Sequence, residues 1–411
     1  METIKVCDAI MGSGKTSGAI GYINAHPEKK FIFATPYLSE VKRIRESCSQ
    51  LRFVEPSNKI PEFNFRKQTH VKVLISEGRN IVTTHQMFKG FTHEILEDVR
   101  KQGYTLILDE ALDVLEASEF KKADLDLLVT AGFAVKEQGA YRATGKVYEG
   151  DLLKDLIRYI STRDLVDMGV DGINFWLLPV ELLSSFSEII ILTYLFEGQG
   201  LYNYLKINDI PFRYIGVSLE GGNYNLADEP DYVPEYVANL REKITILDNK
   251  RLNRIGDDKF ALSLNWAENH PEGVEQLRKN ILNCYTNIWT GNKRGGKMWG
   301  CYAATYNGLK GIGYAKSFVP FNCRATNEYA DRNRLVYAVN IFMNVGMKIF
   351  YKQRGIECND DAYALSTMVQ WIWRSAIRKG EPVEIYIPSR RMRGLLEKWL
   401  DDLSERKEVK A

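Results

Sequence analysis

The sequence lacks the features that would tie it to a membrane or to an oxidising compartment. No run of about 18 apolar residues occurs in the chain, so we expect no membrane-spanning segment. Its six cysteines stand far apart without a Cys-x-x-Cys pair, which argues against a zinc site or a disulfide framework. We therefore expect a cytoplasmic protein with reduced, mostly buried thiols.

An excess of charge of one sign is also absent, because the formal net charge is only +2. Charge alone thus does not indicate a nucleic-acid partner, although basic residues could still gather on one face. Internal repeats, low-complexity tracts and long linkers are missing as well. With 411 residues and 45% hydrophobic content, the chain is too long for one ordinary core and predicts two or three domains.

What the sequence does contain is a phosphate-binding pattern directly behind its first apolar run, residues 4–9. The pattern is Met11-Gly12-Ser13-Gly14-Lys15-Thr16, although its full form would have glycine at Ala9. Glycines let backbone N–H groups approach a phosphate closely, and residues 17–24 predict a helix whose N-terminus faces the anion. Lys15 would reach the β- and γ-phosphates, and the Thr16 hydroxyl would hold Mg²⁺. We expect a nucleoside triphosphate to be bound by Gly12, Ser13, Gly14, Lys15 and Thr16.

A second apolar run, residues 105–108, closes with the carboxylates Asp109 and Glu110. A buried parallel strand reads as a continuous apolar stretch, and acids at its carboxyl end project into the crevice where ligands bind. We predict that Asp109 binds Mg²⁺ through water and that Glu110 polarises the attacking water. The alternative is a strand that ends in solvated acids.

Strand-like runs alternate with helical ones along the chain, which is typical of parallel sheets covered by helices. The first sheet should be complete by about residue 205, after strands at 30–36, 80–85, 105–109 and 188–194. Residues 113–182 are too long for a usual connection, and their leucines recur at helical spacing, so we predict a helical insertion there. Later strand candidates are 243–247, 259–263, 299–305, 318–321 and 383–387, with helices at 273–289, 362–379 and 390–403.

These patterns predict an α/β fold of two domains. The first spans residues 1–205, with the insertion at about 113–182, and binds the nucleotide. The second spans residues 206–411 and ends in a helix. Because the second domain has no phosphate loop of its own, we expect it to close over nucleotide bound to the first.

The order of motifs resembles superfamily 2 helicases, the DExx-box class with two RecA-like domains, and in detail the phage or prophage DEAD/DEAH-like type. The resemblance covers nearly the whole chain. It assigns motifs I, Ia, Ib, II, III, V and VI to residues 11–16, 34–36, 82–85, 109–112, 192–194, 325–327 and 370–378. Motif III lacks the usual Ser-Ala-Thr, and no adenine-reading glutamine motif precedes Met11, so base preference stays open.

The resemblance implies that Gln370 and the arginines of motif VI belong to the ATP site between the domains. The usual pattern would place its second arginine at Ile377, whereas here Arg378 follows one place later. Arg374 is then the candidate for the finger that neutralises charge on the γ-phosphate. Arg378, four residues on, would share one helix face with Gln370 and Arg374. We expect Trp371 and Trp373, on the same segment, to pack in the core.

By the same resemblance, motifs Ia, Ib and V touch the phosphate backbone of a nucleic-acid strand, and they include Thr35, Thr84, His85 and Thr326. Threonines at strand ends also cap helices, which is the alternative for these positions. A basic loop, residues 291–297 with Lys293 and Arg294, could follow phosphates or form a solvated turn. The arginines that open the last helix, at 390, 391 and 393, are surface charge or a nucleic-acid rim.

These features together predict an ATP-dependent translocase or helicase that uses Mg²⁺. Its substrate would be single-stranded or forked DNA rather than RNA, in phage DNA replication or recombination, with a replication or recombination protein as a possible partner. One alternative is a terminase-like packaging ATPase, which would need several nuclease acids where this chain has the basic stretch 370–378. The other is an ATP-switched nucleic-acid-binding protein that remodels or anneals strands without unwinding.

Overall fold

The computed structural model describes residues 3–36, 38–63, 66–118, 120–137, 140–150, 153–167, 174–228, 232–290, 296–323 and 328–408. The chain divides into two compact units. The first comprises residues 1–10, 14–232 and 344–358, and the second comprises residues 11–13, 233–343 and 359–411. Each unit has its own sheet.

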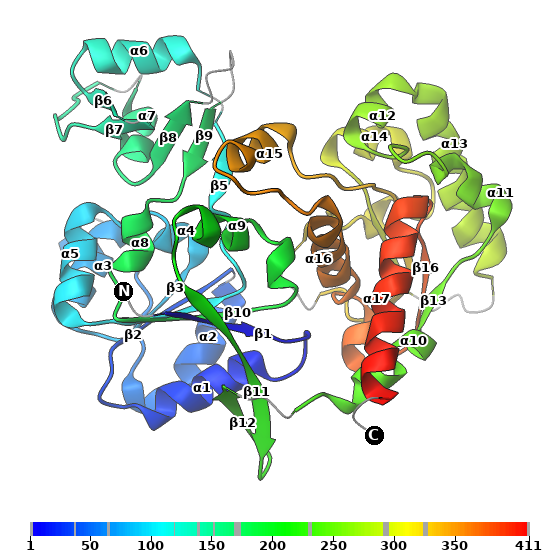
Figure 1. Ribbon diagram of the computed structural model, residues 1–411, viewed down its shortest axis with the longest axis horizontal. Coiled ribbons are helices and arrows are strands. Elements are labelled where there is room, and N and C mark those ends of the chain that lie inside the picture. The colour runs from blue at the N-terminus through cyan, green and yellow to red at the C-terminus, as the bar shows by residue number, and fades with distance from the viewer. Residues whose placement is uncertain are drawn as a thin grey trace. The chain divides into compact units, whose positions relative to one another are not determined.

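The first unit is built on a seven-stranded sheet with the order β12-β11-β1-β10-β4-β2-β3 (Figure 1). Six strands are parallel, and the edge strand β12 is antiparallel to β11. The central strands are continuous apolar runs because helices cover both faces, and the five strands expected before residue 205 are confirmed. The strands are β1 (Ile4–Asp8), β2 (Phe31–Thr35), β3 (Ile81–Thr84), β4 (Thr105–Asp109), β10 (Glu188–Thr193), β11 (Phe212–Glu220) and β12 (Asn223–Ala227).

Two helices, α1 (Lys15–Ala25) and α2 (Leu38–Ser47), cover one face of this sheet. Their apolar residues Ala19, Ile23, Val41 and Ile44 pack with strand residues such as Phe33 and Ile107. This packing anchors the start of α1 beside the carboxyl ends of β1 and β4. The remaining helices of the unit are α3 (Lys67–Ser76), α4 (His85–Phe88), α5 (His93–Gln102), α8 (Val180–Ser184), α9 (Gly200–Ile207) and α15 (Val345–Lys352).

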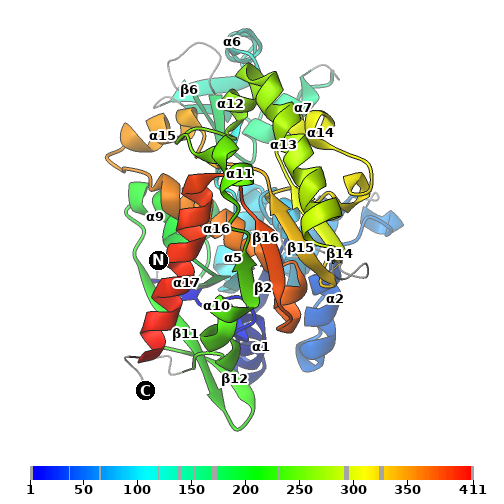
Figure 2. The ribbon, with the colours of Figure 1, turned by 90° about the vertical axis from the view of Figure 1, so that its right-hand side faces the viewer.

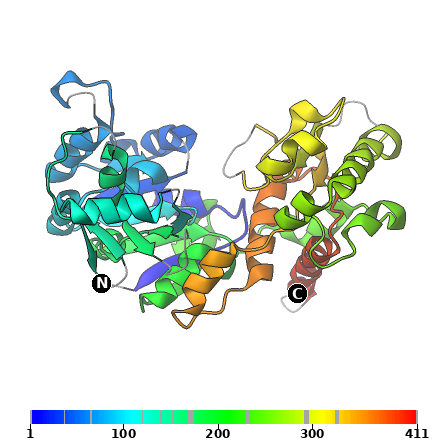
Figure 3. The same cartoon turned by 90° about the horizontal axis from the view of Figure 1, so that it is seen from above.

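The expected insertion is present, but it is only partly helical. Helices α6 (Lys122–Thr130) and α7 (Lys154–Ile160) accompany a five-stranded antiparallel sheet with the order β5-β9-β8-β7-β6 (Figures 1 and 3). Strands of three or four residues are too short for alternation to stand out in a sequence, which explains why the sheet was missed. They are β5 (Leu115–Ala117), β6 (Ala134–Glu137), β7 (Ala140–Ala143), β8 (Asp164–Asp167) and β9 (Asn174–Leu177).

The domain boundary expected at residue 205 falls too early. β11 pairs in parallel with β1, with Ile4 opposite Phe212, so the hairpin β11–β12 extends the first sheet. The chain also returns to the first unit at residues 344–358. There α15 is held by the Tyr351 hydroxyl, which donates to the Gly200 carbonyl at 3.2 Å. Both corrections depend on contacts between residues far apart in the sequence, which a pattern of neighbouring residues does not predict.

The second unit contains a four-stranded parallel sheet with the order β13-β16-β15-β14, and Figure 2 shows β16 and β15 side by side. Its strands are β13 (Ile244–Ile246), β14 (Gly296–Gly300), β15 (Arg332–Tyr337) and β16 (Val383–Tyr386). The strand expected at 259–263 is wrong because those residues form turns, and 318–321 makes only one bridge, between Trp299 and Phe318. β15 was missed because it opens with the polar run Arg332-Asn333-Arg334.

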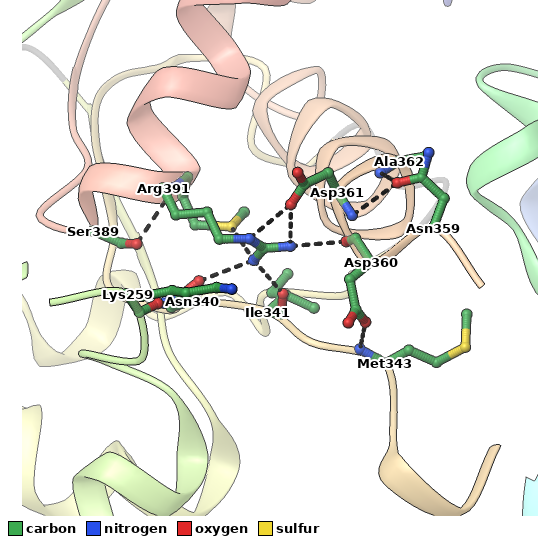
Figure 4. A network of polar contacts seen from close by, with 11 residues as sticks. Lys259, Asn340, Ile341, Met343, Asn359, Asp360, Asp361, Ala362, Ser389 and Arg391 are labelled. Atoms are coloured by element: carbon green, nitrogen blue, oxygen red, sulfur yellow. Dashed lines mark hydrogen bonds and ion pairs between the residues drawn. The ribbon is translucent and has the colours of Figure 1, made fainter. Parts of the chain in front are cut away.

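A polar network around Arg391, at the start of α17, joins this helix to the start of α16 and to the segment after β15 (Figure 4). The guanidinium donates to the Asn340 side chain at 3.0 Å, to the Ile341 carbonyl at 2.7 Å and to the Asp360 carbonyl at 2.9 Å, and it pairs with Asp361 at 2.7 Å. Arg391 is therefore a structural residue, neither plain surface charge nor a rim. The helices are α10 (Leu240–Lys243), α11 (Lys250–Asn253), α12 (Leu264–Asn269), α13 (Pro271–Asn283), α14 (Tyr306–Leu309), α16 (Asp360–Ile372) and α17 (Arg390–Glu408).

Among the described residues, every helix is too short or too polar to cross a membrane.

Candidate active site

The phosphate loop leaves the carboxyl end of β1 at Asp8 and enters α1 at Lys15. Two of its glycines have left-handed backbones, with φ of 82° at Gly12 and 86° at Gly14, which other residues adopt only at a cost. Gly14 is the N-cap of α1, so the helix N-terminus lies at the loop as the sequence predicts. Ser13 is only 2% exposed, and its hydroxyl has no hydrogen-bond partner within the described part of the chain.

Lys15 places its ammonium group beside the loop itself. Nζ donates to the backbone carbonyls of Ala9 and Ile10, the latter at 3.1 Å. Burial lowers the pKa of Lys15, while the nearby carboxylates of Glu110 and Asp109 act in the opposite direction. A cation held between a glycine loop and acidic side chains is suited to bind phosphate oxygens.

Thr16 and Asp109 lie together although 93 positions separate them in the sequence. The Thr16 hydroxyl donates to Oδ1 of Asp109 at 3.5 Å. Burial raises the pKa of Asp109 to about 7, and the neighbouring charge of Glu110 adds to the rise. A hydroxyl and a carboxylate are oxygen donors of the kind that Mg²⁺ prefers, so this pair fits the cation.

Glu110 follows β4 in a strained conformation. Its φ is 67°, in the left-handed region that costs energy for a residue with a side chain. The backbone is held there because the Glu110 N–H donates to the Leu192 carbonyl of β10 at 2.9 Å. The strain lies at the carboxyl edge of the sheet, next to Asp109, where a bound nucleotide would be expected.

Asp8 joins the phosphate loop to the segment after β10, a role that the sequence pattern did not predict. Its carboxylate accepts the N–H groups of Leu195 at 2.8 Å and Phe196 at 3.1 Å. Leu195, two residues after the end of β10, is also left-handed, with φ of 55°. The sequence signal that could have identified Asp8 is its position, because it is an acidic residue at the end of the strand that leads into the phosphate loop. The ends of β1, β4 and β10 are thus fixed to one another by hydrogen bonds.

The motif VI segment is not one continuous helix. α16 ends at Ile372, Ser375 is extended with ψ of −170°, and a short 3₁₀ turn, Ala376–Lys379, follows. The Ser375 hydroxyl donates to the Ile372 carbonyl at 2.6 Å, which satisfies a helix-end carbonyl and closes the helix. Gln370, Arg374 and Arg378 therefore do not share one helix face, which corrects the expectation drawn from four-residue spacing.

The two arginines after α16 also differ in burial. Arg374 is 3% exposed, whereas Arg378 is exposed. Arg374 lies near Cys323, whose pKa burial raises and the arginine charge lowers. Gln370 is buried on α16 and donates to the Ser366 hydroxyl at 3.4 Å. Trp371 and Trp373 are buried, as the core interpretation predicts, and so are Ile372 and Ile377.

Of the residues expected to contact nucleic acid, the described part of the chain includes Thr35, Thr84 and His85. Thr35 is fully buried, so its hydroxyl is not presented at the surface. Thr84 is the N-cap of α4 and accepts the N–H of Met87 at 3.4 Å, which favours the capping alternative, and His85 is the first residue of that helix. Lys293, Arg294 and Thr326 lie outside the described residues.

Residues 238–400 match the model of a family described as the YonV C-terminal Rossmann-like domain. The chain is 36% identical to the SPbeta prophage-derived uncharacterized protein YonV of Bacillus subtilis (strain 168). The alignment spans 412 residues and covers 98% of this chain and 100% of that protein.

Solved structures that align with this chain include an XPD helicase. That alignment has a TM-score of 0.45 and 10% sequence identity, and it covers 98% of this chain and 95% of the helicase chain. A second is Xpd4 of S. tokodaii, with a TM-score of 0.46, 11% identity, and coverage of 97% and 94%. A third is the DUF1998 helicase MrfA bound to DNA and AMPPNP, with a TM-score of 0.33, 11% identity, and coverage of 98% of this chain and 48% of that one.

Proposed function

The chain belongs to the YonV family, and from this premise we propose that it is an ATP-dependent nucleic-acid translocase or helicase of the superfamily 2 type. Its action would lie in phage DNA replication or recombination, inside the bacterial host cytoplasm. A prophage relative that matches the whole chain supports the phage setting. The order of the helicase-like motifs supports the reaction class, since it covers nearly all of this chain.

The observation that carries the proposal is the convergence of Lys15, Thr16 and Asp109 at the carboxyl edge of the first sheet. A glycine loop, a cation, a hydroxyl and a partly buried carboxylate are the parts from which a triphosphate and Mg²⁺ site is made. Mg²⁺, when bound, would neutralise charge on the phosphate oxygens. Thr16 and Asp109 would hold it, Asp109 through water.

Hydrolysis would then depend on the acidic end of β4. Lys15 would bind the β- and γ-phosphates, and Glu110 would orient a water for attack on the γ-phosphorus and accept its proton. The bond to the β–γ bridging oxygen breaks in the same reaction, leaving ADP and phosphate. Asp8, Leu195 and the end of β10 would hold this edge in place through the contacts described above.

The test is the rate of ATP hydrolysis with no polymer, with single-stranded DNA, with duplex DNA and with RNA. We expect stimulation by DNA, and ATP-dependent strand displacement on a forked duplex. A protein that binds DNA and ATP but displaces no strand would be the ATP-switched binder instead. The same protein with Lys15→Ala should lose hydrolysis, because the cation that contacts the transferred phosphate is gone.

The matched control is Lys42→Ala on α2, whose side chain is 79% exposed and makes only a surface ion pair. It should hydrolyse ATP at the normal rate. Undiminished turnover in a folded Lys15→Ala protein, shown by an unchanged melting curve, would contradict the nucleotide site proposed here.

A further inference from the structure

The hairpin β11–β12 reaches well beyond the strand that carries the phosphate loop. β11 has nine residues and β1 has five, and their last paired residues are Ile215 and Cys7. β11 therefore continues for five residues past that pair, about 16 Å, on the edge of the sheet where the loop leaves β1. The hairpin turns at Gly221 and Gly222, both with positive φ, as a tight two-residue turn requires.

A face of glycines on α1 lets β12 approach this helix closely. A Cβ atom on Gly18 would lie 3.3 Å from the backbone of Asn225, and one on Gly21 would lie 3.0 Å from the carbonyl oxygen of Tyr224. With Gly14, these residues recur at intervals of four and three, so they line one side of the helix. β12 thus runs along α1 and places Tyr224 at the loop.

Tyr224 lies directly on the phosphate loop. A Cβ on Gly14 would lie closest to Cδ1 of the ring and 2.6 Å from both Cγ and Cε1. Nearly equal distances to three neighbouring ring atoms place Gly14 over a face of the ring rather than at its edge. Any side chain at Gly14 would expel the ring, so the glycine serves this contact as well as the left-handed turn.

A second tyrosine completes the aromatic wall. Tyr232 contacts Tyr224 with ring centroids 5.7 Å apart and planes at 69°. Burial raises the pKa of Tyr232, and so does a hydrogen bond between the two hydroxyls. Both rings are half-buried and pack at the margin of the core beneath α1, so each keeps part of its surface open.

We propose that Tyr224 is the platform on which the base of a bound nucleoside triphosphate stacks. The inference rests on the proposed nucleotide site. A triphosphate seated on residues 12–16 must lead its ribose and base away from the loop, and Tyr224 stands beside Gly14 with Tyr232 behind it. Stacking on an aromatic ring tolerates any base, so the wall selects nucleosides over bare phosphate chains rather than one base over another.

The experiment compares Mg²⁺–ATP with Mg²⁺–tripolyphosphate, which carries the phosphates without a nucleoside, by titration calorimetry on the full chain. Tyr224→Leu keeps apolar volume against Gly14 but removes the ring. We expect its Kd for ATP to rise about tenfold, the loss of one base–aromatic stack, with the Kd for tripolyphosphate unchanged. Tyr224→Phe should retain the ATP affinity of the original protein within about twofold, since the ring remains.

The matched control is Tyr214→Leu on β11. Cross-strand pairing puts Leu219 opposite Tyr224, so Tyr214, an odd number of positions from Leu219, points to the other face of the sheet. It should leave both affinities unchanged. If Tyr224→Leu binds ATP as tightly as the original protein, the stacking inference is wrong but the nucleotide site is not affected. The same holds if Tyr224→Leu loses equal affinity for ATP and for tripolyphosphate. If the original protein binds neither ligand, the nucleotide site itself fails.

Discussion

Backbone strain and proposed chemistry coincide at Glu110. A left-handed conformation in a residue other than glycine costs about 1 kcal/mol or more and persists only where neighbouring structure enforces it. At Glu110 the hydrogen bond from its N–H to the Leu192 carbonyl enforces the left-handed conformation. The chain therefore turns directly after Asp109, at the carboxyl end of β4. The position of a carboxylate relative to water matters for catalysis, so this strain is consistent with a residue held for a reaction.

Glu110→Gln should bind ATP normally, because Lys15, Thr16 and Asp109 are unchanged. Turnover should fall by about 10² to 10⁴, since an amide of the same shape orients water less well and accepts no proton. Steady-state hydrolysis and nucleotide titration check both parts. Glu46→Gln, at a side chain 67% exposed on α2, serves as the control and should behave normally. Near-normal turnover of Glu110→Gln would place the catalytic carboxylate elsewhere.

Glu188 links several elements at the amino-terminal end of the central strands, opposite the end that carries the phosphate loop. It lies buried at the start of β10 and accepts hydrogen bonds from Lys5 of β1 at 2.6 Å, from Lys29 at 2.9 Å and from Tyr22 of α1 at 2.7 Å. Burial by itself would raise the pKa of this carboxyl, yet the three donors lower it to about 2. The cluster thus fastens α1 to the centre of the sheet, at the end away from the loop.

Glu188→Gln should lower the free energy of unfolding at neutral pH by about 2 kcal/mol, because bonds to a charged acceptor are lost. The pKa is lower in the folded than in the unfolded chain, so this stabilisation is complete above about pH 4.5 and is lost as the pH falls toward 2. Urea unfolding at several pH values should therefore show the gap between the two proteins narrowing with acid.

The control for that series is Glu94→Gln, which removes an exposed ion pair with Lys72. Its unfolding midpoint should hardly move at any pH, because solvent screens such pairs. A gap between Glu188→Gln and the original protein that stays constant down to pH 2 would mean that the Glu188 carboxyl is not held ionised by its neighbours.

At the scale of the whole molecule, the proposed function requires the second unit to take part in ATP hydrolysis. Arg374 is the residue that tests it, because it is buried just beyond α16 while Arg378 is exposed on the following turn. α16 ends at Ile372, so Arg374 and Arg378 do not lie on one helix. We therefore expect substitutions of the two arginines to have different effects on ATP hydrolysis.

Arg374→Gln should lower turnover by about 10³-fold while nucleotide affinity changes much less, if its charge stabilises the transferred phosphate. Arg378→Ala should have a smaller effect. Steady-state ATPase, nucleotide titration and melting curves on both variants, with Arg374→Lys as the charge-retaining control, check this. If neither arginine slows hydrolysis in a folded protein, the segment is structural and the helicase proposal loses its support from the second unit.

The sequence by itself determined the parts of this protein that are local. The phosphate loop, the apolar strands β1 to β4 and β10, and the acids that close β4 each lie within a few consecutive residues. Their chemistry follows from residue types and from continuous apolar runs, which mark strands buried on both faces. The corresponding expectations for these strands are confirmed by the sheet order.

Only the tertiary structure decided the parts that depend on partners far away in the chain. The polar opening of β15 gives no strand signal, yet the strand lies between β14 and β16. The hairpin β11–β12 and residues 344–358 join the first unit through pairing and docking with distant segments. The same holds for Tyr224, because a pattern of neighbours along the chain reports which side of a segment is buried but not what covers it.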